Sequence, residues 1–386
     1  MSDKLTLALI GCGGMMGAHV AGYKELYEAN LRDFRIIACC DVDEARANAM
    51  ADTIGEFQGR RPNVYGSVDT LLTKEQGLMA CDISVVHRQH HSVAIPCFEA
   101  GKHVTIEKPL AFTMRTGKLM LDAAAKAGTK FQVAENYRRD PSQRAIRWAV
   151  QNGRIGDVRM ILWHDCGERL WYWTWREHKD QAGGGWPLDG GVHFADLFRF
   201  FIGPVVDVYC DTRQYNPFRY ENANPLGGKQ IPVDVEDTTF ATLRFEGDVL
   251  GSWLSTAAAP GGGFSKRIIY GSEGSLDLGE GIKSRTEEVS LAQLTDEYRQ
   301  QLSCEDEARL FPACITNSVA TELKEFVDAC LLGTPIETDG LEGYKAEAIC
   351  FALYESAWLR RPVTLAEVEA LEVEGYQKEL NDSVGV

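Results

Sequence analysis

The first third of the chain alternates short apolar runs with longer amphipathic stretches, and no other feature constrains the fold as strongly. The apolar runs predict strands and the amphipathic stretches predict helices. The expected strands are Leu5–Ile10, Arg35–Cys40, Ile83–Val86, His103–Ile106 and Lys130–Val133. The expected helices are Gly17–Glu28, Glu44–Ile54, Ser92–Ala100 and Lys118–Lys126. Because short strands joined by helices form parallel sheets, residues 1–135 are predicted to form a doubly wound α/β domain.

Residues 136–386 have a different pattern, which predicts a second, α+β domain. Its expected strands are Val158–His164, Val205–Arg213, Thr238–Phe245, Leu250–Thr256, Lys266–Tyr270 and Ser275–Leu278. Turns such as Glu246–Asp248 join them with few helices between, which indicates an antiparallel sheet. The expected helices are Ser142–Gln151, Val319–Leu332 and Tyr344–Leu359. We interpret Gln214–Gln230, which is rich in Asn, Pro and Gly, as a loop, and the weakly patterned tail Glu374–Val386 as a partly mobile end.

The charge of the chain limits the partners that it can bind. Its 386 residues include 40 basic and 56 acidic side chains, for a net charge of −16. This excess repels phosphate backbones and anionic lipid surfaces, so we expect neither a nucleic acid nor a membrane partner. No apolar segment approaches the roughly 20 residues of a membrane-spanning helix, and no basic export signal precedes Leu5. Since the 11 cysteines form no CxxC pair, we expect a cytoplasmic protein with reduced thiols.

A glycine-rich turn lies where the first strand meets the first helix, with the sequence Gly-Cys-Gly-Gly-Met-Met-Gly over residues 11–17. Glycines there permit a tight turn and let the backbone approach a pyrophosphate at the helix N-terminus, which predicts a bound dinucleotide. Met16 stands where a third glycine is usual, so we expect the helix to pack slightly further from the strand. The turn residues expected to contact the cofactor are Gly11, Gly13, Gly14, Met15 and Met16.

Asp41 ends the second expected strand, about two dozen residues after the glycine-rich turn. A carboxylate in this place accepts hydrogen bonds from the ribose diol of NAD, and it would repel the 2′-phosphate of NADP. The position therefore favours NAD. Arg46 lies nearby and keeps NADP as the less favoured alternative.

Further motifs follow in order along the chain: His19 behind the glycine-rich turn, Glu107-Lys108-Pro109, Asn136-Tyr137-Arg138, and Asp189-Gly190-Gly191-Val192-His193. Together with Asp41 they resemble the glucose-fructose oxidoreductase / inositol dehydrogenase / rhizopine catabolism (Gfo/Idh/MocA) family. The resemblance implies an N-terminal Rossmann domain, a C-terminal domain with a large, mostly antiparallel open sheet, and a homo-oligomer, either a dimer or a tetramer. It also implies NAD-dependent oxidation or reduction of a secondary alcohol on a small-molecule sugar, glycoside or cyclitol.

The same resemblance assigns roles to individual residues. It implies that Lys108, Asp189 and His193 surround the reacting hydroxyl. The other residues expected to contact the cofactor are His90, Glu107, Lys108 and Asn136, and those expected to contact the substrate include Tyr137, Arg138, Asp189 and His193. The chain departs from the family at the end of the third main strand, where Val85-Val86 replaces the usual Thr-Pro.

Oxidation of a secondary alcohol requires a group that accepts the hydroxyl proton. His193 is the best candidate because the ordinary pKa of histidine lies nearest to working pH. Asp189 can orient the imidazole or bind the substrate, and Lys108 can stabilise the developing alkoxide. Lys108 remains the alternative proton acceptor. Each residue also has a purely structural interpretation, as an interior histidine, a helix N-cap or a surface lysine.

Five of the eight tryptophans lie between Trp163 and Trp186. Indole rings pack against sugar C–H surfaces, so this segment predicts a substrate wall for a bulky neutral ligand such as a glycoside. Alternating tryptophans equally fit a strand or a subunit interface. The residues of this segment expected to contact substrate are His164, Trp175 and Trp186. Its histidines and acids lack the spacing of a metal motif, so we expect no metal.

Two other functions fit the same motifs. An enzyme that retains NAD can oxidise a glycoside, eliminate its substituent and return the hydride, or it can pass the hydride from one sugar to another. Only the net redox change separates these reactions from that of a dehydrogenase. A non-catalytic protein that senses NAD and sugar has no need of Lys108, Asp189 and His193 together.

Overall fold

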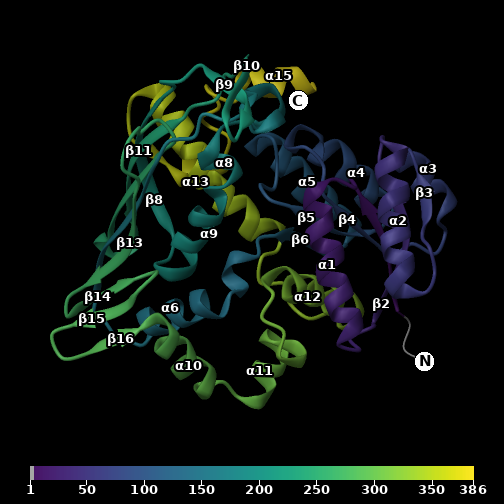
Figure 1. Ribbon diagram of the computed structural model, residues 1–386, viewed down its shortest axis with the longest axis horizontal. Helices are drawn as coiled ribbons and strands as arrows, with labels where there is room; N and C mark the ends of the chain where they lie inside the picture. Colours follow the sequence, from purple (N-terminus) through teal and green to yellow (C-terminus); the bar gives the residue numbers. More distant parts are fainter. Residues whose placement is uncertain (1–3) are drawn as a thin grey trace. The chain divides into compact units, whose positions relative to one another are not determined.

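The computed structural model describes residues 4–386, which form two compact units (Figure 1). The first unit comprises residues 4–112, 116–140 and 303–344. The second comprises residues 113–115, 141–302 and 345–386. A late segment of the chain thus returns to the first unit. The domain boundary after residue 135 stays a prediction.

A six-stranded parallel sheet forms the centre of the first unit, with the order β3-β2-β1-β4-β5-β6. The strands are β1 (Leu5–Ile10), β2 (Phe34–Cys40), β3 (Asn63–Tyr65), β4 (Ala80–Ile83), β5 (His103–Glu107) and β6 (Phe131–Ala134). The α-helices of this part are α1 (Gly14–Glu28), α2 (Glu44–Gln58), α3 (Val68–Lys74), α4 (His90–Glu99), α5 (Met114–Ala127), α11 (Cys304–Leu310) and α12 (Ser318–Leu332). The predicted doubly wound fold is confirmed.

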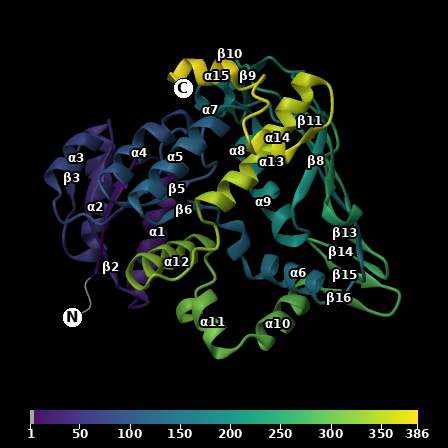
Figure 2. The ribbon, with the colours of Figure 1, turned by 180° about the vertical axis from the view of Figure 1, so that it is seen from behind.

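The core of the first unit includes side chains from its sheet and from α1 and α12. Leu7 of β1, Val20 of α1 and Leu323 of α12 belong to one buried apolar cluster. Gly22 permits the two helices to approach closely, because a Cβ there would lie 3.3 Å from the Cα atom of Ala320. The two helices lie side by side in both views of the chain (Figures 1 and 2).

A nine-stranded sheet runs through the second unit, with the order β16-β15-β14-β13-β7-β12-β11-β8-β17. Its neighbouring strands are antiparallel except for β7 and β12, which are parallel. This confirms the predicted, mostly antiparallel sheet. The strands are β7 (Val158–Cys166), β8 (Val205–Arg213), β11 (Thr238–Phe245), β12 (Leu250–Thr256), β13 (Phe264–Gly271), β14 (Gly274–Asp277), β15 (Gly281–Ser284), β16 (Glu288–Ser290) and β17 (Val363–Thr364).

The remaining α-helices are α6 (Pro141–Gln151), α7 (Lys179–Ala182), α8 (Trp186–Asp189), α9 (Val192–Phe201), α10 (Leu291–Gln301), α13 (Gly340–Leu359), α14 (Leu365–Glu369) and α15 (Lys378–Val384). None of the helices among residues 4–386 combines the length and the hydropathy that crossing a membrane requires.

The two faces of the nine-stranded sheet differ. On one face, Trp163 of β7 and Trp253 of β12 pack against Phe194 and Phe198 of α9, with ring centroids 4.6–6.3 Å apart. Successive residues of a strand point to opposite faces, so the other face carries the intervening side chains. Large apolar residues of that other face are exposed, namely Met160, Tyr209, Phe240, Leu250 and Tyr270.

Two predictions about segments of the second unit are wrong. The expected loop Gln214–Gln230 contains a β-hairpin of β9 (Phe218–Ala223) and β10 (Leu226–Pro232). Both strands are largely exposed, so they lack the apolar alternation that signals a strand. The tail Glu374–Val386 is more ordered than predicted, because it includes α15 and because Glu374 forms an ion pair with Arg115.

A smaller correction concerns β4, which ends at Ile83, where the prediction placed its start. The strand contains Asp82, a polar residue that interrupts the apolar run in the sequence. In the structure Asp82 is fully buried and hydrogen-bonded to His19. A buried polar pair of this kind has no signature in local hydropathy.

Candidate active site

The glycine-rich turn has the backbone geometry that a bound pyrophosphate needs. Gly11 has a φ of +85°, and a Cβ there would lie 2.2 Å from the carbonyl oxygen of Ser84, so the position requires glycine. Gly13 is the N-cap of α1, and neither it nor Gly14 has a described atom within 4 Å of an added Cβ. The N-terminus of α1 is therefore open to an anion, and the turn fits the dinucleotide predicted for it.

The two methionines of the turn have different environments. The side chain of Met16 is fully buried in the apolar core of the first unit, whereas Met15 is half-buried. The side chain of Met16 thus packs where a third glycine would leave space. Any contact of Met16 with a cofactor would come from its backbone.

Asp41 joins the end of β2 to the glycine-rich turn. One carboxylate oxygen accepts the N–H of Cys12 at 2.7 Å, and the other accepts the N–H of Asp43 at 2.8 Å. A carboxylate has about four lone-pair sites, so the half-buried Asp41 keeps capacity for two ribose hydroxyls. Arg46, which kept NADP as an alternative, lies 3.2 Å from Asp43 in an ion pair.

His90 and Asn136, two further cofactor candidates, lie in the interior of the first unit. His90 is fully buried, with its ring nitrogens 3.1 and 3.2 Å from two backbone carbonyl oxygens. Burial, assisted by neighbouring His87, lowers the pKa of His90 to about 4, so the ring is neutral near pH 7. Asn136 is half-buried and donates to the hydroxyl of Ser318 at 3.2 Å. Their contacts with a cofactor stay predictions.

Glu107 and Lys108 follow one another at the end of β5. Glu107 is buried, and one of its oxygens lies 2.9 Å from the ring of His19. Its other oxygen accepts the backbone N–H of Lys108 at 3.1 Å. The backbone at the candidate catalytic lysine is therefore tied to a buried carboxylate.

Two substrate candidates, Tyr137 and Arg138, lie in a 3₁₀ turn after β6. Tyr137 is exposed, whereas Arg138 is buried and its guanidinium lies 3.4 Å from Glu342. A ligand can reach Tyr137 directly, but Arg138 already has an ion-pair partner within the first unit.

Asp189 and His193 lie at the two ends of the short junction between α8 and α9 in the second unit. Asp189 is the last residue of α8, and His193 belongs to the first turn of α9. Both side chains are buried. Asp189 accepts a hydrogen bond from Nε of Arg176 at 3.1 Å.

The junction itself requires its two glycines. A Cβ on Gly190 would lie 2.6 Å from the indole of Trp186, and one on Gly191 would lie 2.6 Å from the indole of Trp253. Both rings would have to move to admit a larger residue. The Asp-Gly-Gly-Val-His sequence therefore has a packing reason in addition to any chemical one.

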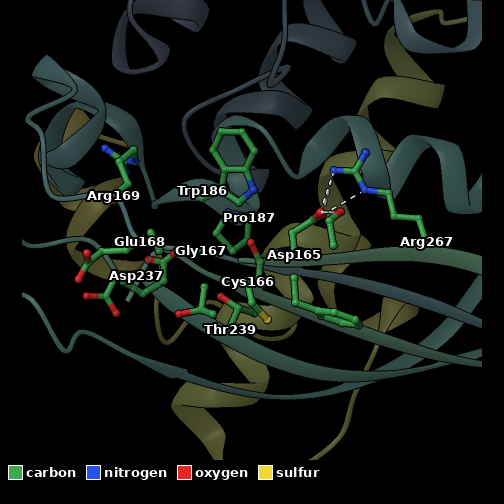
Figure 3. A pocket seen from close by; sticks show the side chains of 16 residues that line it. Asp165, Cys166, Gly167, Glu168, Arg169, Trp186, Pro187, Asp237, Thr239 and Arg267 are labelled. Atoms are coloured by element: carbon green, nitrogen blue, oxygen red, sulfur yellow. Dashed lines mark hydrogen bonds and ion pairs between the residues drawn. The ribbon is translucent and has the colours of Figure 1, made fainter. Parts of the chain in front are cut away.

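A cavity of about 380 Å³ lies next to α8 in the second unit (Figure 3). The ends of β7 and β12 and the starts of β11 and β13 form its floor, and Trp186 and Pro187 of α8 form a wall. Asp165 of β7 and Arg267 of β13 form an ion pair at 3.0 Å on its surface. The cavity thus combines an indole face with charged and hydroxyl groups, which suits a polyhydroxylated ligand.

The tryptophan-rich segment connects this wall to Asp189. The rings of Trp173 and Trp186 lie 5.8 Å apart, and the guanidinium of Arg176 lies over the ring of Trp175 at 4.4 Å. Residues Thr174–Glu177 form a 3₁₀ helix, so the alternating tryptophans do not form the strand that their spacing allowed. Arg176, which also bonds Asp189, joins the tryptophans to the candidate catalytic carboxylate.

His164 is not brought into this site. It neighbours Trp163 and Asp165 along β7, so its side chain lies on the opposite face of the sheet from theirs. There its Nε2 lies 2.9 Å from the hydroxyl of Ser252.

Glu236 also lines the cavity, and it is not among the residues predicted from the sequence. Its carboxylate accepts hydrogen bonds from the hydroxyl of Tyr354 at 2.7 Å and from the N–H of Gly185 at 3.0 Å. Loss of solvent around it raises the pKa of Glu236 to about 7. No local signal marks it, because an acidic residue in a polar stretch looks like a solvated one. Within residues 4–386, no group of three His, Cys, Asp or Glu side chains is placed to hold a metal ion.

Both parts of the chain match the same family. Residues 5–135 match the family described as "Oxidoreductase family, NAD-binding Rossmann fold", and residues 143–277 match the "GFO/IDH/MocA C-terminal domain". The chain belongs to the GFO/IDH/MocA oxidoreductase family. The family and the NAD cofactor predicted from the motifs are therefore confirmed, and the glycine-rich turn belongs to an NAD-binding Rossmann fold.

Two dehydrogenases resemble this chain over about two thirds of its length or more. Levoglucosan dehydrogenase of Pseudarthrobacter phenanthrenivorans is 31% identical over 296 residues, which are 71% of this chain and 73% of that protein. D-glucoside 3-dehydrogenase of Escherichia coli K12 is 27% identical over 267 residues, 67% of this chain and 71% of that protein. A structure of levoglucosan dehydrogenase with NADH and levoglucosan has a TM-score of 0.77 at 23% identity, covering 94% of this chain and all of that one. This structural similarity confirms the fold.

Proposed function

We propose that this protein is an NAD-dependent dehydrogenase that acts on a secondary ring hydroxyl of a sugar, glycoside or cyclitol. Relatives named for levoglucosan and for D-glucosides support this substrate class. The observation that carries the proposal is the junction of α8 and α9, where buried Asp189 and His193 follow the cavity wall formed by Trp186 and Pro187. Bound NAD would supply the hydride acceptor, and the glycine-rich turn and Asp41 would hold it.

In this reaction His193 accepts the hydroxyl proton, because an imidazole nitrogen that reaches the substrate can act as a general base. Asp189 binds the substrate or orients the imidazole, and its bond with Arg176 holds the carboxylate in place. Lys108 stabilises the developing alkoxide by its charge. Lys108 is also the alternative proton acceptor.

The charged side chains that line the cavity indicate which sugars it can bind. Its lining includes four acidic side chains, Asp165, Glu168, Glu236 and Asp237, but only two basic ones, Arg169 and Arg267. This excess of acid disfavours phosphorylated or carboxylated sugars. The indole of Trp186 favours the C–H face of a ring. A neutral glycoside fits both properties.

The test is the appearance of NADH, followed at about 340 nm, when the protein and NAD are mixed in turn with glycosides, free sugars and inositols. Lys108→Met is expected to abolish turnover while NAD still binds. Lys126→Met, which removes an exposed lysine of α5, is the matched control and should turn over normally. Full activity of Lys108→Met would remove Lys108 from the mechanism.

The nucleotide released by denaturing the purified protein separates the alternatives. Co-purified NAD without net NADH would favour a retained cofactor, and the masses of the products would then distinguish hydride exchange between sugars from redox-neutral glycoside cleavage. A protein that binds NAD but turns over no sugar of any class would contradict the proposal and favour a sensor.

We also infer that the protein is a homo-oligomer. The exposed face of the nine-stranded sheet carries Met160, Tyr209, Phe240, Leu250 and Tyr270 on adjacent strands. Contiguous apolar surface of this kind is typical of protein interfaces. A second copy of the chain would cover it.

A further inference from the structure

A buried polar cluster in the first unit includes side chains that have no role in the proposed reaction. It consists of His19 and Tyr23 on α1, Asp82 on β4 and Glu107 at the end of β5. His19 Nδ1 lies 2.9 Å from Asp82, and His19 Nε2 lies 2.9 Å from Glu107. The hydroxyl of Tyr23 donates to Asp82 at 3.1 Å. His19 and Asp82 are fully buried, and Glu107 nearly so.

The geometry determines the charge of His19. A neutral imidazole carries one N–H, so one of its two nitrogens would direct a lone pair at a carboxylate oxygen. Only the imidazolium donates from both nitrogens. Burial by itself would lower the pKa of His19, but the charges and hydrogen bonds of Asp82 and Glu107 outweigh it and raise the pKa well above its ordinary value. With both carboxylates ionised, the pair of contacts therefore favours a charged ring.

The other groups around the ring do not compete with these bonds. Tyr23 bonds Asp82 from the same helix. Burial raises the pKa of Glu322, on α12, well above its ordinary value, which disfavours its charged form. Arg139, which also influences Glu322, is paired with Glu325. The ring of His19 thus lies between the carboxylates of Asp82 and Glu107, 2.9 Å from each.

Glu107 connects the ring of His19 to the backbone of Lys108. One of its oxygens is bound by the imidazolium of His19, and the other accepts the backbone N–H of Lys108 at 3.1 Å. A carboxylate bound at both oxygens in a buried site has little freedom to rotate. The backbone at Lys108 is accordingly fixed from the interior of the first unit.

We propose that His19 is a positioning residue, an imidazolium clamp that holds Glu107 and through it the backbone at Lys108. This inference rests on the proposed function, because the position of Lys108 affects turnover only if Lys108 stabilises the alkoxide. The clamp gives His19, which lies in the second turn of α1, a role in the reaction.

The test compares His19→Gln with Tyr23→Phe. Both remove a hydrogen bond from the same buried cluster, but only the first acts on Glu107. We expect His19→Gln to lower kcat about 100-fold, as a small displacement of a reacting group does, with KM for NAD little changed. Hydrogen exchange of the Lys108 amide should become faster in the same variant. Tyr23→Phe should leave both kcat and this exchange at the wild-type value.

Equal effects of the two variants on kcat and on the Lys108 amide would overturn the proposal, since His19 would then serve stability alone. The ¹⁵N shifts of the His19 ring in the wild-type protein need no variant to fold, and they should show both nitrogens protonated above pH 7. A neutral ring would also overturn the clamp. If the wild type forms no NADH with any sugar, the proposed function fails. Hydrogen exchange of the Lys108 amide and the ¹⁵N shifts of the His19 ring would still test whether His19 holds Glu107.

Discussion

Asp41 has two tasks in this molecule, because its carboxylate both bonds the glycine-rich turn and lies where a ribose is expected. Asp41→Asn keeps an oxygen that can accept the N–H of Cys12, whereas Asp41→Ala does not. We therefore expect Asp41→Ala alone to lower the free energy of unfolding, by about 1–3 kcal/mol. Both variants should bind NAD more weakly and discriminate less against NADP.

Urea denaturation and calorimetric titration with NAD and NADP check these expectations. Asp41→Asn is the control that separates charge from hydrogen bonding. An Asn variant with the full wild-type preference for NAD would show that the carboxylate charge does not set cofactor choice.

Glu236 makes stability depend on pH with a defined sign. Its pKa is about 7 in the folded protein and near the ordinary 4.5 when unfolded, so between these values the folded state binds more protons. Its contribution to the free energy of unfolding is complete below about pH 4.5 and is lost as pH rises through about 7. The expected loss is about 1–3 kcal/mol, allowing for the partial exposure of the side chain.

Glu236→Gln, which resembles the protonated acid, should remove this dependence. Urea denaturation of both proteins between about pH 5 and pH 8 measures the difference. The wild type is expected to lose stability relative to the variant as pH rises. A constant difference across this range would show that Glu236 has the same pKa in the folded and unfolded chains.

Among the elements, the junction between α8 and α9 requires glycine because of close packing and not because of backbone strain. Gly191 has an ordinary φ of −72°, but a Cβ there would lie 2.5 Å from the carbonyl oxygen of Pro187. Gly191→Ala is expected to cost about 1–3 kcal/mol of unfolding free energy, as overpacking does. It should also raise KM for the sugar, since α8 carries the cavity wall.

Gly167→Ala is the matched control for this prediction. Gly167 also lines the cavity, but no described atom lies within 4 Å of an added Cβ. Thermal or urea denaturation of the two variants should show a loss only for Gly191→Ala. An unaffected Gly191→Ala would mean that both the backbone of Pro187 and the indole of Trp253 move aside without cost.

Strands with one buried face were predictable, and strands without one were not. The predicted bounds of β8, β11 and β12 coincide with the observed strands, because every second side chain enters the core. The hairpin of β9 and β10 is largely exposed, and its two strands are joined by backbone hydrogen bonds that any residue can make. Hydropathy therefore could not reveal it.

At the scale of the whole molecule, the exposed sheet face predicts how copies associate. Phe240 is the most exposed of the apolar residues named for this face, and it lies on β11 opposite Asp211 of β8. Phe240→Lys should dissociate the oligomer without unfolding the subunit, because the new charge pairs with Asp211 but cannot be buried against a second copy. Sedimentation velocity measures the change.

Leu332→Lys is the control, since Leu332 is equally apolar and more exposed but lies at the end of α12 in the first unit. It should leave the oligomer intact. A wild-type protein that sediments as a monomer at micromolar concentration would contradict the inferred assembly.

The features that repeat at short range could be predicted from the sequence. Alternation of apolar residues specified the strands and helices, glycines at Gly11 and Gly13 specified a turn open to a pyrophosphate, and the order of the motifs identified an oxidoreductase family. These signals are local because periodicity and turn chemistry depend on neighbours a few residues apart.

Contacts between side chains that are far apart in the sequence became visible only in the folded chain. The tertiary structure placed His164 on the far face of the sheet, joined Arg176 to Asp189, partly removed Glu236 from water, and enclosed His19 between two carboxylates. The charge and task of such a side chain depend on partners separated from it by many residues. Burial and pairing act between residues that meet only in the folded chain, so no local sequence pattern records them.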